Sequence, residues 1–351
     1  MYNNEINIPS LLKIGSGKIA KIGKYLIDRN YTKIALFFSD GIEGLVADKL
    51  YPGLEKYNIS IVHKDIISDI NIENAVHTAF KIPSETKVLL GIGGGKALDY
   101  GKYCAHILKL PYITVPTSVS NDGFCSPNTS LLVAGKRKSV KSTIPYGVVA
   151  DIDVIETAPK SSLYSGIGDT ISKITALWDW KQSFVKGFEY FNDFAGLMAY
   201  NSLDIIYLCD KLKPEDHEFK YRMVNSLVLS GIAMEIAGSS RPASGSEHLI
   251  SHALDNVLTD SKMHGLQVGI ATYLCSFLQN NQHEKVKDFL LKTGFLNFIE
   301  KDPVNKNEFI KALQLAPSIK QNYYTVLSEK DSFDKAINFI ETDSILKQII
   351  K

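Results

Sequence analysis

Three of the eight histidines stand close together in the sequence, at His248, His252 and His264. His248 and His252 are four positions apart, so they share one face if Ser246–Leu258 is helical, and His264 would open the next helix. Two neutral imidazoles and one carboxylate make a zinc site with one coordination position open for water or substrate. The spacing therefore predicts a metal or acid–base site, against the alternative of core histidines bonded to neighbouring backbone.

Asp169 is the candidate for the missing carboxylate. It follows Gly166-Ile167-Gly168, a glycine-flanked stretch that predicts a turn, with Asp169 opening the helix after it. An aspartate there suits a metal ligand and equally suits an N-cap whose carboxylate accepts a main-chain N–H. The residues alone leave both interpretations open.

A glycine cluster links a strand to a helix in the first half of the chain. The strand predicted over Lys87–Ile92 runs through Gly93, Gly94 and Gly95 into a helix over Gly94–Leu108. Glycines let main-chain N–H groups approach a pyrophosphate, and the positive end of the helix dipole favours phosphate charge. The strand context favours a phosphate-binding turn over a tight turn that binds nothing.

Two further polar positions follow predicted strands. The loop Pro116–Pro127, after the strand Tyr112–Pro116, carries four hydroxyls, an amide and the carboxylate of Asp122. Asp40 ends the strand Lys33–Asp40, where a carboxylate can accept hydrogen bonds from an adenosine ribose and repel a 2′-phosphate. An ordinary polar connection, and an N-cap at Asp40, are the competing interpretations.

Alternating strands and helices position these residues in the first half of the chain. Short β-branched runs predict strands over Lys33–Asp40, Ile59–Asp65, Lys87–Ile92, Tyr112–Pro116 and Tyr146–Ala150. Helical spacing occurs over Gly41–Tyr57, Ile72–Ile82 and Gly94–Leu108. This rhythm predicts an N-terminal Rossmann-like α/β domain with a parallel sheet. A hairpin of Ser130–Val133 and Lys138–Ser142, turning at Ala134-Gly135-Lys136, is expected to project from it.

Few strand patterns occur after Ala158, and the second half of the chain is predicted to be helical. Amphipathic patterns cover Phe194–Asp210, Tyr221–Ala237, Ser246–Leu258, His264–Gln279 and Lys285–Thr293. We therefore expect an all-α C-terminal domain. The predicted boundary makes residues 1–156 a dinucleotide-binding domain and residues 157–351 a helical domain that binds metal and substrate.

The composition excludes several classes of partner. The 351 residues include 39 Lys and Arg against 38 Asp and Glu, which gives no general field for nucleic acid or an anionic membrane. The N-terminus does not resemble a signal peptide, and no apolar run reaches the roughly 18 residues of a membrane span. Four scattered cysteines predict free thiols. We expect a cytoplasmic protein that binds neither nucleic acid nor membranes.

Taken in this order, these segments resemble the glycerol-1-phosphate dehydrogenase family, a branch of the iron-containing alcohol dehydrogenase and dehydroquinate synthase-like superfamily. The resemblance runs from Asp40 to the His264 helix and is most specific in Gly168–Ala176 and Gly245–His252. It implies a dehydroquinate synthase-like fold in which a Rossmann-like α/β domain precedes an all-α domain. It also implies a nicotinamide cofactor, a divalent metal and a small polyol phosphate bound between the two.

The resemblance implies roles for individual residues. The family's metal ligands fall on Asp169, His248 and His264. Its substrate contacts fall on Asp122, Asp169 and His252. Its cofactor contacts fall on Asp40, Gly93, Gly94, Gly95, Lys96, Ala97, Thr117, Ser118, Val119, Ser120 and Ser126.

The resulting hypothesis is reversible hydride transfer between a nicotinamide and C2 of a glycerol-type substrate, with dihydroxyacetone phosphate and glycerol 1-phosphate as the pair. Zinc is the expected metal and would polarise the ketone, and nickel or iron accept the same ligands. As catalytic residues we expect His252 to deliver a proton or bind a substrate hydroxyl, and Asp122 to orient the substrate. We expect the cofactor to be NAD(H), with NADP(H) also accepted. We expect the protein to form a homo-oligomer.

Three other functions stay open at this point. A glycerol or other polyol dehydrogenase would keep metal and cofactor but take an unphosphorylated substrate, and Asn121, where the phosphate branch often has histidine, bears on this choice. A dehydroquinate synthase-like cyclase typically has glutamate where this chain has Asp169, together with basic phosphate-binding residues. A non-catalytic protein of this fold would bind the cofactor without a metal.

Overall fold

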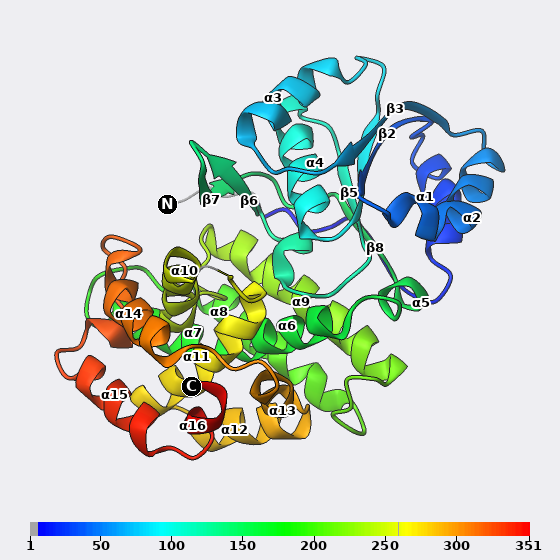
Figure 1. Cartoon of the computed structure of the whole chain (residues 1–351). Helices are drawn as coiled ribbons and strands as arrows, with labels where there is room; N and C mark the ends of the chain where they lie inside the picture. Colours follow the sequence, from blue (N-terminus) through cyan, green and yellow to red (C-terminus); the bar gives the residue numbers. More distant parts are fainter. Residues whose placement is uncertain (1–5, 259) are drawn as a thin grey trace. The chain divides into compact units, whose positions relative to one another are not determined.

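The computed structural model describes residues 6–258 and 260–351 of the chain (Figure 1). The chain forms two compact units that divide between Pro159 and Lys160. The first unit is built on a β-sheet and the second is helical, which confirms the predicted fold class. In the part of the chain that the structure describes, no helix is long and apolar enough to cross a membrane.

A six-stranded sheet in which every pairing is parallel forms the centre of the first unit. The strands lie in the order β1-β8-β5-β4-β2-β3. Their bounds are Leu11–Gly15 (β1), Lys33–Ser39 (β2), Ser60–Ile67 (β3), Val88–Gly93 (β4), Tyr112–Pro116 (β5) and Gly147–Asp151 (β8). The sequence analysis misses β1, an edge strand in which Leu11 is the one buried residue, because it carries no clear alternation.

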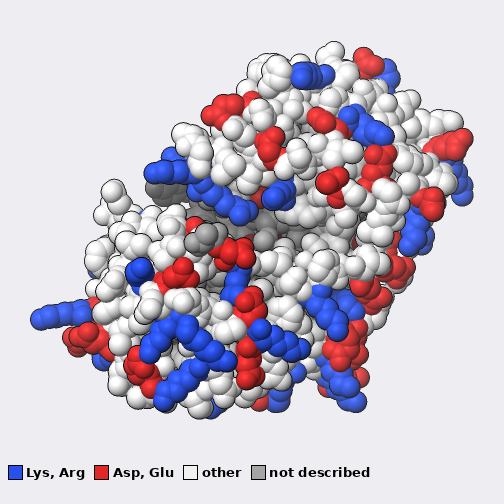
Figure 2. All heavy atoms as spheres, in the orientation of Figure 1, with Lys and Arg blue, Asp and Glu red and all other residues white. Residues whose placement is uncertain are grey.

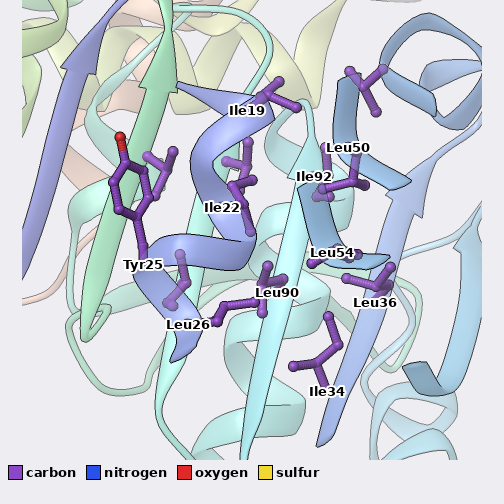
Figure 3. Packing of buried hydrophobic residues seen from close by; sticks show 14 of the residues in the cluster. Ile19, Ile22, Tyr25, Leu26, Ile34, Leu36, Leu50, Leu54, Leu90 and Ile92 are labelled. Carbon is purple, nitrogen blue, oxygen red and sulfur yellow. The ribbon is translucent and has the colours of Figure 1, made fainter. Parts of the chain in front are cut away.

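Four helices cover the two faces of this sheet, namely α1 (Ile22–Ile27), α2 (Ile42–Glu55), α3 (Ile72–Lys81) and α4 (Gly95–Leu108). Alternate residues of β2 enter different layers. Ile34 and Leu36 pack with α1 and α2 (Figure 3), and Ala35 and Phe37 pack with α3 and α4. β4, β5 and β8 are buried along their whole length, as expected of parallel strands covered on both faces. The sheet therefore holds the carboxyl ends of β2, β4 and β5 in fixed positions.

A separate hairpin pairs β6 (Asn128–Val133) with β7 (Lys136–Lys141). Val133 pairs directly with Lys136, so the turn contains Ala134 and Gly135 alone, both with positive φ. The predicted three-residue turn is wrong by one position, because this pair of left-handed residues closes a two-residue turn. Basic side chains of β7 gather at this hairpin, whereas acidic and basic residues are interspersed over most of the face in Figure 2.

The second unit consists of helices, and its described residues include no named strand. Their bounds are Lys160–Ile171 (α6), Lys173–Val185 (α7), Asp193–Asp204 (α8), His217–Ala237 (α9), Ser246–Val257 (α10), His264–Leu278 (α11), His283–Lys292 (α12), Phe295–Glu300 (α13), Lys306–Leu315 (α14), Ser332–Thr342 (α15) and Leu346–Ile349 (α16). The short α5 (Ile152–Ile155) follows β8 in the first unit. Each predicted helix of this half is present, but the one expected over Phe194–Asp210 ends at Asp204.

Candidate functional site

Asp169, His248 and His264 come together inside the helical unit. Each offers one ligand atom, and the three atoms lie within 4.8 Å of one another. Nε2 of His248 is 3.6 Å from Oδ1 of Asp169, and the rings of His248 and His264 are centred 5.0 Å apart. A tetrahedral ion with ligand distances of about 2.1 Å would separate its ligand atoms by about 3.4 Å. This donor set, two imidazoles and a carboxylate, therefore fits a divalent transition metal.

Close packing of α6 on α11 brings Asp169 beside His264. A Cβ on Gly168 would lie 1.9 Å from the main-chain oxygen of Gly265, and one on Gly265 would lie 1.9 Å from that of Ser165. The two backbones can approach this closely only because both positions are glycine. The prediction that Asp169 opens a helix after a turn is wrong, since it lies near the end of α6. The N-cap interpretation of Asp169 is wrong for the same reason, because an N-cap precedes the first turn of a helix.

Buried Lys173 holds the second oxygen of the Asp169 carboxylate. Its Nζ lies 3.3 Å from Oδ2 of Asp169 and donates to the main-chain oxygen of the same residue at 2.6 Å. Burial raises the pKa of Asp169, but Lys173 and His248 outweigh it, so the net pKa lies below the usual range. The carboxylate is thus kept ionised with Oδ1 turned toward the histidines. The sequence analysis did not single out Lys173.

A second carboxylate, Glu247, lies behind His248. Its Oε1 is 2.8 Å from Nδ1 of His248, while Nε2 of the same ring faces Asp169. Burial lowers the pKa of His248, but hydrogen bonds to Asp169 and Glu247 more than offset it, and the net shift is upward. Glu247 is fully buried and was not predicted to support a ligand. Its place directly before His248 was visible in the sequence, but its orientation toward the ring was not.

His264 has a neutral partner instead. Its Nδ1 lies 3.0 Å from the hydroxyl of Ser251, which is also hydrogen-bonded to the carboxamide of Gln267 at 2.8 Å. His252, one turn after His248 on α10, stacks its ring on that of His264 at 5.5 Å between centroids. The structure therefore brings all three predicted histidines into one cluster with Asp169.

The glycine turn of the first unit is open on one side. Gly93 has φ +146°, and a Cβ there would lie 2.2 Å from Oγ of Ser39, so the fold itself requires glycine. The N–H of Gly94 donates to the same hydroxyl at 3.0 Å. A Cβ on Gly94 or Gly95 would have no neighbour within 4 Å. The N-terminal end of α4 consequently faces open space that main-chain N–H groups border.

The other predicted cofactor residues lie around this turn within the first unit. The N–H of Thr117 donates to the main-chain oxygen of Gly93 at 3.0 Å. Asp40 is exposed and follows Ser39, whose hydroxyl contacts the glycines. The N-cap interpretation of Asp40 is wrong, because Gly41 precedes α2. Four predicted positions lie buried or half-buried in the loop after β5, namely Ser118, Val119, Ser120 and Ser126. Two more, exposed Lys96 and buried Ala97, lie in the first turn of α4.

Asp122 begins a short 3-10 turn over Asp122–Cys125, where it is half-buried. Buried Lys102, which the sequence analysis missed, stabilises this turn. Nζ of Lys102 donates to the main-chain oxygens of Gly123 at 2.6 Å and Ser126 at 3.0 Å. Burial lowers the pKa of Lys102, which Asp99 at 3.4 Å opposes. An Asp–Lys spacing of three on a helix was readable in the sequence, but its burial was not.

The chain shares sequence with known dehydrogenases along nearly all of its length. The sequence profile of the iron-containing alcohol dehydrogenase family matches residues 13–159. The glycerol-1-phosphate dehydrogenase [NAD(P)+] of Metallosphaera sedula is 32% identical over 332 residues, which cover 94% of each chain. That of Methanosarcina barkeri is 33% identical over 327 residues, 92% of this chain and 91% of the relative.

Solved structures share the fold at lower identity. Glycerol dehydrogenase from Schizosaccharomyces pombe has a TM-score of 0.76 at 19% identity and covers 99% of this chain and 92% of its own. Sulfoacetaldehyde reductase from Bifidobacterium kashiwanohense, in complex with NAD+, has a TM-score of 0.72 at 14% identity over 98% of this chain and all of its own. These likenesses establish the architecture of both units.

Proposed function

The chain belongs to the glycerol-1-phosphate dehydrogenase family, and we propose that it interconverts dihydroxyacetone phosphate and glycerol 1-phosphate with NAD(H) or NADP(H). Relatives of that name match it over more than nine-tenths of its length. The observation that carries the proposal is the cluster of Asp169, His248 and His264, which three separate helices bring within ligand distance of one another. A purely structural role would not require one carboxylate and two imidazoles to place their ligand atoms within 4.8 Å of one another.

In this proposal the helical unit holds metal and substrate. A divalent ion on Asp169, His248 and His264 would supply Lewis-acid polarisation of the substrate carbonyl. Zinc suits the ligands, and nickel and iron accept the same set. His252 lies beside this cluster, where its imidazole can deliver a proton or bind a substrate hydroxyl. We also propose that Asp122 orients the substrate.

The first unit holds the cofactor in this proposal. The main-chain N–H groups at the start of α4, beginning with Gly95, and the positive end of the α4 dipole receive the pyrophosphate. Asp40 accepts hydrogen bonds from the adenosine ribose and disfavours a 2′-phosphate, so NAD(H) is preferred over NADP(H). We assign residues 1–156 to the cofactor and residues 157–351 to metal and substrate.

We also propose a homo-oligomer in the cytoplasm. Seven large apolar side chains between positions 184 and 200 are 43% to 76% exposed, namely Phe184, Val185, Phe188, Tyr190, Phe194, Leu197 and Tyr200. Large apolar side chains exposed along one stretch of the chain favour an association surface there, and a second copy of the chain is the simplest occupant. All four cysteines are thiols, which suits a reducing compartment.

The proposed reaction is tested by following NADH oxidation by metal-analysed protein with dihydroxyacetone phosphate and dihydroxyacetone offered separately. A strong preference for the phosphate is the expected result. A preference for the free ketone would contradict the phosphate substrate and assign the chain to polyol oxidation, with the same metal and cofactor residues. Absence of turnover with both substrates and zinc supplied would contradict the dehydrogenase assignment.

A further inference from the structure

Glu247 occupies an unusual position for a residue in the first turn of a helix. It is 0% exposed, and both of its oxygens are engaged inside the helical unit. Oε1 accepts the main-chain N–H of Gly245 at 2.6 Å and lies 2.8 Å from Nδ1 of His248. Oε2 accepts the hydroxyl of Thr175 at 2.7 Å. The carboxylate is therefore fixed on three sides, and one of those sides is a predicted metal ligand.

Gly245 is needed for this arrangement. A Cβ at that position would lie 3.0 Å from Oε2 of Glu247 and 2.6 Å from Oδ2 of Asp179. Asp179 accepts the N–H of Ser246 at 2.7 Å and the N–H of Val326 at 2.7 Å. Asp179 thus fixes the start of α10, and the Glu247 carboxylate has little freedom to move away from His248.

The chemistry of the contact selects one form of the imidazole. An ionised carboxylate only accepts hydrogen bonds, so Nδ1 of His248 must carry the proton that lies between the two groups. In the neutral ring the lone pair then falls on Nε2, the atom 3.6 Å from Oδ1 of Asp169. A carboxylate behind a ligand histidine also increases the basicity of the ring.

We propose that Glu247 is a positioning residue that locks His248 in the Nδ1–H tautomer, with Nε2 presented as a strong donor to a divalent metal. The inference rests on the proposed metal site. The two histidines differ in the charge of their partners, because Nδ1 of His248 faces the carboxylate of Glu247 whereas Nδ1 of His264 faces the neutral hydroxyl of Ser251. We therefore expect His248 to be the more strongly supported of the two ligands.

The test compares zinc affinities of chelator-stripped full-length variants by competition with a chromophoric chelator. Glu247→Gln keeps the size of the side chain but removes the charge, and we expect zinc to bind 10- to 100-fold more weakly. Ser251→Ala is the matched variant at the other histidine, with an expected loss of less than about fivefold. Glu247→Asp, which keeps the charge but withdraws it from the ring, should resemble Glu247→Gln and serves as the second variant if that one does not fold.

Nitrogen-15 NMR of the imidazole rings gives a readout that a merely structural role would not move. At a pH high enough for the ring to be neutral, the His248 signal of the metal-free wild type should show a protonated Nδ1 and an unprotonated Nε2, and Glu247→Gln should show a mixture of tautomers. Folded variants with unchanged zinc affinity and an unchanged tautomer would overturn the role of Glu247 while leaving the metal site intact. A wild type that does not bind zinc would overturn the metal site itself.

Discussion

The two units build their candidate sites from different materials. In the first unit the glycine turn offers main-chain N–H groups at the open end of α4, and Gly94 and Gly95 have no neighbours that a Cβ would meet. In the second unit the cluster of Asp169, His248 and His264 consists of side chains, and each is held by another polar group of the interior. One site depends on the absence of side chains and the other on their mutual support.

Because of this difference, function and folding are easier to separate in the first unit than in the second. In the open turn, a residue can change the site without touching the protein's interior. Around Asp169, His248 and His264, the buried charges of Lys173 and Glu247 contact the predicted ligands directly, so most changes there affect both stability and the site. Substitutions in the two units should therefore have different signatures.

The largest expected effect is the loss of a metal ligand. His264→Ala should remove bound zinc and lower turnover at least about 1,000-fold, because two remaining ligands leave the ion open to solvent. Its stability should change little, since His264 is only half-buried. Metal analysis and NADH oxidation on one preparation check this, with His77→Ala, an exposed histidine of α3, as control. A metal-loaded, active His264→Ala enzyme would remove His264 from the site.

Lys102→Met should be the most destabilising change in the first unit. It leaves Asp99 without its cation and two main-chain oxygens without a donor, which costs about 3–5 kcal/mol of the free energy of unfolding. Exposed Lys96→Met is the matched control, with an expected change below about 0.5 kcal/mol. Urea unfolding measures both. Equal stabilities would show that Lys102 does not hold the Asp122 turn.

Asp179 should make stability depend on pH. Burial, with the nearby charge of Glu247, raises its pKa to about 7. Between about pH 4 and pH 7 the folded protein keeps a proton that the unfolded chain releases, so this contribution is complete below about pH 4 and disappears as the pH rises through 7. Asp179→Asn should lose this part of the dependence, roughly 1–4 kcal/mol, in urea unfolding at pH 5 and pH 8. An identical pH dependence in the variant would contradict the raised pKa.

The glycines of the turn give the sharpest contrast within one motif. Gly94→Ala should leave the free energy of unfolding unchanged but weaken NADH binding about tenfold or more, because the new methyl group projects into the space proposed for the pyrophosphate. Gly93→Ala should cost about 2 kcal/mol of stability, because its φ and Ser39 exclude a side chain. Unfolding curves and fluorescence titration with NADH separate the two effects. Tight NADH binding by Gly94→Ala would place the cofactor elsewhere.

Asp40→Ala should have the smallest effect. Asp40 is exposed, so its removal should leave stability within about 0.5 kcal/mol of the wild type. With the carboxylate gone, the preference for NADH over NADPH should fall several-fold in kcat/KM, since the repulsion of a 2′-phosphate is lost. A ratio equal to that of the wild type would show that Asp40 does not contact the ribose.

Local patterns predicted the sheet and the histidines but not the contacts between elements. β2, β4 and β5 were found because parallel buried strands are continuous apolar runs between glycines and helices, and this signal is local. β1 was missed because its sequence, Leu-Leu-Lys-Ile-Gly, shows neither a continuous apolar run nor a clear alternation. The segment Gly166-Ile167-Gly168 was misread as a turn, because Gly168 serves a close approach of α6 to α11 that only the partner helix reveals.

The supporting residues of the site were missed for the same reason. Glu247, Lys173 and Lys102 look like ordinary charged helix residues in the sequence, and nothing local distinguishes a buried charge from a solvated one. Their roles follow from the atoms they face, which belong to residues a few positions away on one helix or to a different segment. The resemblance to a known family supplied the ligand set, and the structure supplies what holds it.

A zinc titration of the chelator-stripped protein, with turnover of dihydroxyacetone phosphate and NADH measured at each step, tests whether an ion on Asp169, His248 and His264 is needed for the reaction. Activity should be absent at the start, rise in proportion to bound zinc and reach its maximum at one ion per chain. Full activity in protein that holds less than about one-tenth of an ion per chain would contradict this requirement.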